Sequence, residues 1–185
     1  MSAYYSTDAW LLAARNTGEA DRLITFFTKE LGRVDAIAKG ARLAKAKLKG
    51  HLVLFARLRI LVTRGKEFWR LLDAEYANGL ELCGGLPYMQ NFAQFFGRLV
   101  SHGLPDESLW EVLSRFGGLD SHEKLVRLKL ELLAVLGLLP ASDELGQFFS
   151  GDAVGYIADT AISNPEIVEE CELGIEKILI ANHVL

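Results

Sequence analysis

The hydrophobic pattern of this chain changes its period near residue 80, and that change constrains the fold more than any other feature. Before it, apolar and polar residues alternate in runs rich in aromatic and β-branched side chains, as along Leu52–Arg64. Side chains that alternate in this way point to opposite faces of a β-strand. After it, apolar residues recur every three or four positions, which is typical of amphipathic helices. The sequence therefore predicts an α+β, multi-domain chain with a boundary between residues 1–80 and residues 81–185.

The first 80 residues predict a small closed barrel of five strands. These strands are expected at Ala9–Arg15, Leu23–Thr28, Arg33–Lys39, Leu52–Arg64 and Phe68–Tyr76. Between the second and the third, Lys29–Gly32 fits a hairpin loop with its glycine in the left-handed conformation. Along the fourth, alternation places Phe55, Arg57 and Arg59 on the face opposite the apolar one. Five strands at this spacing, with a long connector after the third, are typical of small barrels.

Residues 81–185 predict an all-α domain. Helical faces are expected within Tyr88–Leu99, Leu109–Phe116, Leu125–Leu139, Asp152–Ile162 and Val168–Leu179. The third is the clearest, because Asp120 and Ser121 are suitable caps and Pro140 stops it. For the last, Asn164 is the expected cap and Pro165 the first helical residue.

A basic run, Lys39–Gly50, interrupts this acidic chain of net charge -4. Residues 1–80 hold 14 Lys and Arg against 8 Asp and Glu, a net charge of +6, and the remaining 105 residues hold 6 against 16, a net charge of -10. Segregation of this kind indicates that one half handles a polyanion. The best candidates for phosphate contacts are the cations of the run, Lys39, Arg42, Lys45, Lys47 and Lys49. In an extended loop the last three would present one cationic edge; the alternative is a solvated loop.

Other cations of the barrel could extend this surface. Arg57 and Arg59, beside Phe55, could form a patch that stacks on bases, or they pair with acidic neighbours. Arg33 is a further candidate, and so, with lower odds, are Arg64, Lys66 and Arg70. Trp69 adjoins a predicted turn and is the only tryptophan that we consider as a platform on which a base could stack. The alternative is a position in the core, which is more common for tryptophan.

Three stretches of the first half, Thr17–Leu23, Phe27–Arg42 and Leu48–Leu52, resemble the RecO family of bacterial recombinational repair proteins. In the second half, Leu125–Pro140 is similar to the family's helix that ends in Leu-Gly-x-x-Pro. The resemblance covers about residues 8–140. It implies an OB-fold barrel joined to a helical domain, and a protein that binds single- and double-stranded DNA and anneals complementary strands. It also implies that the protein binds RecR. With RecR, it would help to load RecA onto DNA coated by single-strand binding protein.

Two departures from the family pattern limit what carries over. Many members have a four-cysteine zinc module after the Leu-Gly-x-x-Pro helix, whereas residues 138–170 here contain no cysteine. Cys83 and Cys171 stand alone, and the four histidines lack metal-binding spacing. We therefore expect neither the zinc module nor any other metal or cofactor. The chain is also shorter than the usual member, so barrel functions carry over better than those of the helical domain.

The resemblance also suggests that the helical domain receives the acidic C-terminal tail of single-strand binding protein. The candidate clamp consists of Arg98, Arg115, Lys124 and Arg127. Lys124 and Arg127 are three positions apart and so share a helical face. The alternative is that Lys124, Arg127 and Lys129 form the solvated side of an amphipathic helix.

No catalytic motif appears: the chain lacks a Walker A pattern, a nucleophile elbow and a dinucleotide loop. We therefore expect a DNA-binding and annealing mediator rather than an enzyme. Two alternatives remain, an adaptor whose barrel binds another protein and a barrel that binds RNA. Because no apolar run reaches the length of a membrane helix, we expect a cytoplasmic, nucleoid-associated protein.

Overall fold

The computed structural model describes residues 3–43, 47–77, 85–158 and 164–184, with the side chains of Lys47, Lys49 and Phe116 left out. By contacts the chain falls into two compact units. The first consists of Met1–Leu82 with Val100–Gly117, and the second of Cys83–Leu99 with Gly118–Leu185. We call them the barrel unit and the helical unit and describe each by itself.

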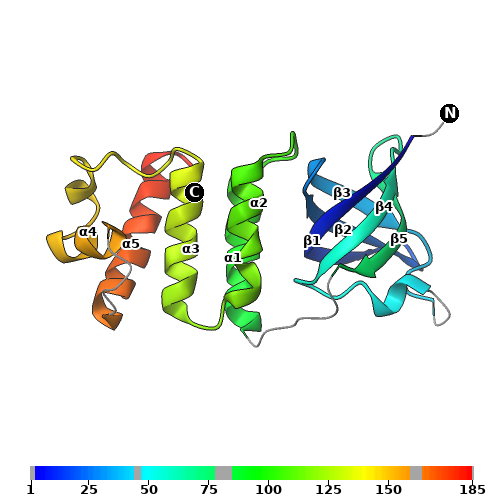
Figure 1. Cartoon of the computed structure of the whole chain (residues 1–185), viewed down its shortest axis with the longest axis horizontal. Coiled ribbons are helices and arrows are strands. Elements are labelled where there is room, and N and C mark those ends of the chain that lie inside the picture. Colours follow the sequence, from blue (N-terminus) through cyan, green and yellow to red (C-terminus); the bar gives the residue numbers. More distant parts are fainter. Residues whose placement is uncertain (1–2, 44–46, 78–84, 159–163, 185) are drawn as a thin grey trace. The chain divides into compact units, whose positions relative to one another are not determined.

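The barrel unit is built on five strands that close into a barrel in the order β1-β2-β3-β5-β4 (Figure 1). The strands are β1 Tyr4–Thr17, β2 Asp21–Thr28, β3 Gly32–Ala38, β4 Arg57–Thr63 and β5 Trp69–Tyr76. All neighbouring pairs are antiparallel except β3 and β5, which run parallel. A five-stranded barrel of this kind has the OB-fold architecture. The fold expected from the sequence is confirmed.

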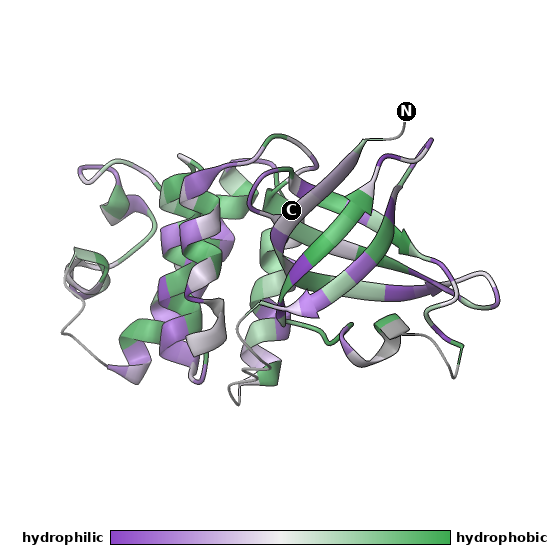
Figure 2. Ribbon diagram, turned by 45° about the vertical axis from the view of Figure 1, so that its right-hand side comes forward, coloured by the Kyte–Doolittle hydropathy of each residue, from purple (hydrophilic) through white to green (hydrophobic). Residues whose placement is uncertain are grey.

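The barrel closes because the apolar side of each strand faces inward. Along β3, buried and half-buried residues alternate without interruption. Hydrophobic and hydrophilic segments both occur along the barrel strands (Figure 2). Leu11, Phe26, Leu58 and Ile60 from three strands meet in a core that is shielded from water. Each of these side chains, once buried, contributes roughly 1.5–3 kcal/mol to the stability of the barrel.

The fourth strand is shorter than the alternation predicted. It begins at Arg57 rather than Leu52, and Leu54 is exposed although it was expected on the apolar face. Phe55 interrupts the pattern because its φ is +67° and its side chain is buried, while its N–H donates to the oxygen of Leu11 over 2.8 Å. The expectation that Phe55 lies beside Arg57 and Arg59 on an exposed strand face is therefore wrong.

A segment beyond residue 80 belongs to the barrel unit. Residues 100–117 contain helix α2 (Glu107–Ser114), whose N-cap Asp106 accepts a hydrogen bond from the N–H of Leu109 over 3.0 Å. The ring of Trp110 in α2 lies 5.5 Å from the guanidinium of Arg57 in β4. The predicted boundary between residues 1–80 and residues 81–185 rested on the change in hydrophobic period. The division of the chain into two domains at that point stays a prediction.

The helical unit contains four of the five described α-helices. They are α1 Leu86–Leu99, α3 His122–Val135, α4 Gly151–Ala158 and α5 Pro165–Ala181. Three short 3-10 helices also occur in the described parts of the chain: η1 Lys47–Gly50, η2 Phe116–Gly118 and η3 Leu145–Gln147. The predicted caps are confirmed, since Ser121 accepts from the N–H of Lys124 and Asn164 from that of Glu166. Helix α3 packs against both α1 and α5. None of the described helices is long and apolar enough to cross a membrane.

Helix α3 ends earlier than Pro140. Gly137 has a φ of +67°, its N–H donates to the oxygen of Ala134 over 3.0 Å, and the N–H of Leu138 donates to the oxygen of Leu133 over 2.8 Å. This pair of bonds is a Schellman motif, which satisfies the last carbonyls of a helix that stops at glycine. The prediction that Leu139 continues the helical face is therefore wrong, because the glycine acts before the proline.

Candidate nucleic-acid interface

The segment between β3 and β4 begins as a docked turn rather than a free loop. We call residues 39–50 the basic connector. The backbone N–H of Gly40, whose φ is +65°, donates to the carboxylate of Asp21 over 2.8 Å. The guanidinium of Arg42 donates to the backbone oxygens of Gly18 and Glu19 in the turn between β1 and β2, over 3.3 and 2.9 Å. Lys39 and Arg42 are both exposed, so this end of the basic connector holds two cations at the surface on a fixed backbone.

The second half of the basic connector is anchored to the barrel as well. Leu48 packs against the barrel core, and the hydroxyl of Tyr76 in β5 donates to the oxygen of Gly50 over 2.8 Å. The rings of His51 and Tyr76 meet edge to face, with centroids 5.3 Å apart. Burial of Leu48 and the following Leu52 fixes the path of a segment that is otherwise strongly basic.

The expected single cationic edge of Lys45, Lys47 and Lys49 requires an extended backbone, and part of it is not extended. Residues 47–50 form the 3-10 helix η1. The backbone of a 3-10 helix is wound at three residues per turn and is not extended. The expectation of an extended backbone is therefore wrong for residues 47–50, and Lys45 lies outside the described residues. Phosphate binding by the three lysines stays a prediction.

Arg57 and Arg59 in β4 share one acidic partner in β1. The carboxylate of Asp8 lies 2.9 Å from the guanidinium of Arg57 and 3.2 Å from that of Arg59. Burial tends to raise the pKa of Asp8, but hydrogen bonds and the charges of both arginines outweigh burial and lower it below 3.8. The carboxylate therefore stays ionised and offsets one of the two positive charges. The side chain of Arg59 is 59% exposed and that of Arg57 36%, so Arg59 is the more accessible of the two to a phosphate.

Arg33 in β3 has a structural contact within the barrel unit. Its guanidinium donates to the backbone oxygen of Val100, at the start of the segment that carries α2. The side chain holds two parts of the unit together that are far apart in the sequence. Its proposed role in DNA binding is not tested by this contact.

The cations proposed as a partner clamp are paired in the helical unit. Lys124 contacts Asp120 over 2.7 Å, and Arg127 contacts Glu123 over 3.3 Å, each one helical turn apart. The guanidinium of Arg127 also lies 3.9 Å from the ring centroid of buried Tyr156, whose pKa burial raises to about 12. Arg115 belongs to the barrel unit, whereas Arg98, Lys124 and Arg127 belong to the helical unit.

The alternative that placed Lys129 with Lys124 and Arg127 on the solvated side of α3 is wrong for Lys129. Its side chain is only 7% exposed, and its ammonium lies 2.6 Å from the carboxylate of Glu172 in α5. Nε2 of His122 lies 2.6 Å from the other oxygen of the same carboxylate. Burial tends to raise the pKa of Glu172, but the hydrogen bonds from Lys129 and His122 outweigh it and lower the pKa below 4.5. The sequence pattern missed this network because its members are far apart in the chain.

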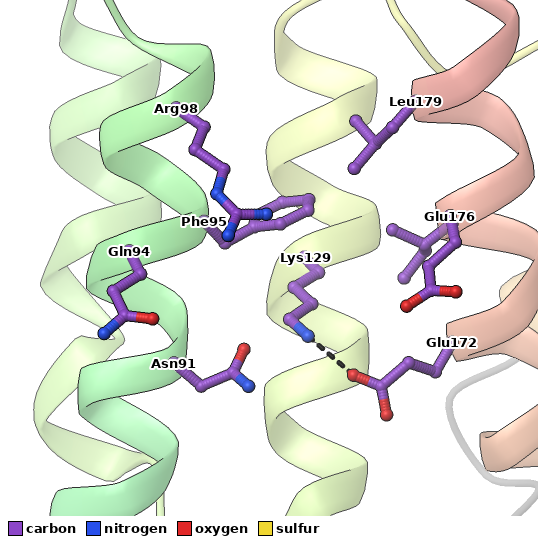
Figure 3. Close-up of a pocket in the computed structure, with 9 residues that line it drawn as sticks. Asn91, Gln94, Phe95, Arg98, Lys129, Glu172, Glu176 and Leu179 are labelled. Carbon is purple, nitrogen blue, oxygen red and sulfur yellow. Dashed lines mark hydrogen bonds and ion pairs between the residues drawn. The ribbon is translucent and has the colours of Figure 1, made fainter. Parts of the chain in front are cut away.

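This network borders a small pocket between α1, α3 and α5. The pocket has a volume of about 180 Å³ and combines exposed Arg98, the ring of Phe95, Lys129 and Leu179 (Figure 3). Figure 3 shows the ammonium of Lys129 joined to Glu172 on one side of this space. Of the four clamp candidates, Arg98 alone lines the pocket.

No group of three or more metal-binding side chains gathers within the described ranges. Cys171 is buried in α5, and burial raises the pKa of its thiol to about 11, which disfavours the thiolate that binds metals. Cys83 lies outside the described residues. The absence of structural zinc stays a prediction.

The comparisons with known proteins agree on one family. Residues 1–80 match the family model described as "Recombination protein O N terminal". A protein of Pelotomaculum thermopropionicum named "DNA repair protein RecO" is 28% identical over 199 aligned residues, which cover 95% of this chain and 77% of the relative. Its namesake in Laribacter hongkongensis is also 28% identical, with 95% and 76% covered. A third, from Gloeothece citriformis, is 32% identical over 118 residues, covering 62% of this chain and 42% of the relative.

Proposed function

We propose that this chain, whose residues 1–80 match the RecO family model, is a RecO-like protein that acts in recombinational DNA repair, where it binds and anneals DNA without enzymatic activity. The observation that carries the proposal is the basic connector docked on a closed OB-type barrel. Barrels of this kind hold single strands along a basic groove, where the phosphates supply most of the affinity. The proposed cellular location is the cytoplasm, at the nucleoid.

The contacts of the basic connector support phosphate binding in a specific way. The backbone N–H groups of Gly40 and Arg42 donate to Asp21 and to the oxygen of Ala20, and these bonds hold exposed Lys39 and Arg42 in place. Cations on an ordered backbone lose less conformational entropy when they bind phosphate than cations on a free loop. Two DNA strands that meet on such a surface repel each other less, because the protein neutralises part of their charge. Annealing then needs no nucleotide hydrolysis.

The proposed partners are single- and double-stranded DNA and RecR. Together with RecR, the protein would help to load RecA onto DNA coated by single-strand binding protein. For the acidic tail of single-strand binding protein, the proposed receiving site is the pocket of Figure 3, whose lining holds Arg98 and Lys129 together with Glu172 and Glu176. Arg98 offers a cation beside the apolar surfaces of Phe95 and Leu179. The paired cations Lys124 and Arg127 would first have to leave Asp120 and Glu123.

The test of DNA binding is a salt titration with a fluorescent oligo-dT. We expect the logarithm of the association constant to fall linearly with the logarithm of the salt concentration, by about 0.7 for each phosphate contacted. Lys39→Glu should lower this slope, whereas Lys177→Glu, the same change at an exposed position of α5, should not. Wild-type protein that does not bind, or binds independently of salt, would favour the adaptor alternative. Competition with oligo-U measures the discrimination between DNA and RNA.

The tail site is tested separately with the fluorescent C-terminal peptide of single-strand binding protein. We expect Arg98→Glu to abolish the rise in anisotropy at moderate salt and Lys177→Glu to preserve it. If the wild type does not bind the peptide, or both variants bind equally, this partner site is rejected while DNA binding by the barrel stands.

A further inference from the structure

A groove opens in the barrel unit where two parallel strands diverge. The pairing of β3 with β5 is limited to Ala36–Ala38 against Trp69–Leu71. Before Ala36 the edge of β3 borders a groove of about 610 Å³, within the range of ligand sites in proteins. Its lining includes Arg33, Asp35, Arg64, Trp69, His102 and Leu104. We call it the Trp69 groove.

The walls of the Trp69 groove are held in place by contacts within the barrel unit. Gly32, with a φ of +67°, lies so close to residues 103 and 104 that a Cβ there would overlap their backbone oxygens. Asp35 accepts a hydrogen bond from the hydroxyl of Thr25 over 2.7 Å and lies 3.1 Å from Nε2 of His102. Because these contacts join the walls to one another, the groove is largely preformed, which lowers the entropic cost of binding.

The aromatic surface of the groove is centred on Trp69. Its indole is half-buried, in contrast to Trp10 and Trp110, which are 7% and 6% exposed. Tyr5 in β1 meets it edge to face, with centroids 5.3 Å apart and planes at 83°. The guanidinium of Arg64 lies 6.0 Å from its centroid, at the outer limit of a cation–π contact. So weak a contact leaves Arg64 able to move to a phosphate at little cost.

The charge of the lining favours a neutral ring over an anion. Arg33 and Arg64 are balanced by Asp35 and Glu67, so the groove does not attract phosphate as the basic connector does. Asp35 and His102 can accept or donate hydrogen bonds at the edge of a ring that stacks on Trp69. A nucleobase combines a flat π-face with a polar edge and is attached to a phosphate that Arg64 could contact outside.

We propose that the Trp69 groove holds an unstacked base of single-stranded DNA, with Trp69 as the platform. The inference rests on the proposed function and adds to it a site that recognises bases, separate in chemistry from the basic connector, which recognises phosphates. Since the bases of duplex DNA are stacked and paired, such a site favours single strands over double strands.

The experiment compares binding of oligo-dT with binding of an abasic oligonucleotide of the same length and charge. We expect the wild type to prefer oligo-dT about tenfold, the effect of one stacked base, at every salt concentration. Trp69→Leu keeps apolar bulk against the barrel but loses the aromatic platform, so this variant should bind both oligonucleotides equally. Trp69→Phe should restore part of the preference. Because the other two tryptophans are buried, oligo-dT should quench the fluorescence of the wild type, and the quenching should be lost in Trp69→Phe.

The outcomes separate this inference from the proposed function. If the wild type binds neither oligonucleotide, DNA binding itself is wrong, and the base site falls with it. If the wild type binds both equally, or Trp69→Leu keeps the preference for oligo-dT, the base site is overturned and phosphate binding stands. Trp69→Phe serves as the readout should Trp69→Leu fail to fold, since unchanged quenching in that variant also overturns the proposal.

Discussion

The basic connector of the barrel unit and helix α3 of the helical unit place their cations in different surroundings. The barrel unit holds 15 Lys and Arg against 12 Asp and Glu, and the helical unit holds 5 against 12. In the helical unit Lys124, Arg127 and Lys129 each contact a carboxylate. In the barrel unit the exposed cations Lys39 and Arg42 sit on a basic connector whose backbone is held by hydrogen bonds. Positive charge at the start of the basic connector is therefore exposed to a ligand, whereas the charges of these three helical-unit cations are offset by carboxylates.

The net charges of the two units differ less than the net charges of the two halves of the sequence do. Residues 1–80 alone carry a net charge of +6, but the barrel unit as a whole carries +3. Glu81 and the segment 100–117 together add four carboxylates and one arginine to it. A ligand responds mainly to the charges near its binding site. The basic connector therefore matters more for binding than the net charge of residues 1–80 or of the whole barrel unit.

The largest expected effect tests the barrel side of this comparison. Changing Lys45, Lys47 and Lys49 together to Glu should weaken binding to oligo-dT and lower the salt slope by about 2, since each lost phosphate contact removes about 0.7. Lys177→Glu is the control in the helical unit. An unchanged slope in a folded triple variant would remove these lysines from the site, and an equal loss in the control would abolish the contrast between the units.

The second prediction tests whether a cation of the helical unit stabilises the fold. Lys129→Met leaves the carboxylate of Glu172 without one of its two partners, the other being His122, and should lower the free energy of unfolding by about 2–3 kcal/mol. Thermal unfolding measures this loss, and the salt slope for oligo-dT should not change. Lys124→Met, which removes an exposed pair, is the matched control and should have little effect. Wild-type stability in Lys129→Met would show that apolar packing replaces the ion pair without cost.

The third prediction concerns acid. Because the pKa of Glu172 is lowered in the folded state, the ionised carboxylate stabilises the helical unit above its ordinary value of 4.5, and this stability is lost as the pH falls through the lowered pKa. Glu172→Gln should therefore make unfolding less dependent on pH below about 4.5. Urea denaturation at a series of pH values measures this dependence. Identical curves for wild type and variant would mean that the network with Lys129 and His122 does not stabilise the fold.

The smallest expected effect sharpens the comparison within the barrel. Asp8→Asn removes the carboxylate that Arg57 and Arg59 share, so both guanidinium groups become available to phosphate. The salt slope for oligo-dT should rise by about 0.7, the equivalent of one further contact. Asp73→Asn, at an exposed position of β5, controls for the change in net charge. Equal slopes in the two variants would indicate that Arg57 and Arg59 serve the barrel and not the DNA.

Local signals in the sequence determined the kinds of elements and their broad order. The alternation along β3 and the three-to-four spacing of α3 each follow from the geometry of a single element, so neighbouring residues suffice to reveal them. The caps Ser121 and Asn164 are local in the same sense. Where prediction failed, a backbone feature intervened, as with the positive φ of Phe55 and of Gly137. A phenylalanine in that conformation has no sequence signature, whereas Gly137 was available as a helix stop and was passed over for Pro140.

The amino-acid sequence by itself determined a five-stranded barrel, a helical region and a basic run between the third and fourth strands. Only the tertiary structure decided which charges are neutralised, because Asp8 is brought to Arg57 and Arg59 by the pairing of β1 with β4. It likewise decided that Lys129 is buried against Glu172 and that Trp69 lines a groove with His102. Periodicity is a property of one element, but an ion pair or a groove depends on which elements pack together. Those contacts join residues far apart in the chain, and no local pattern encodes them.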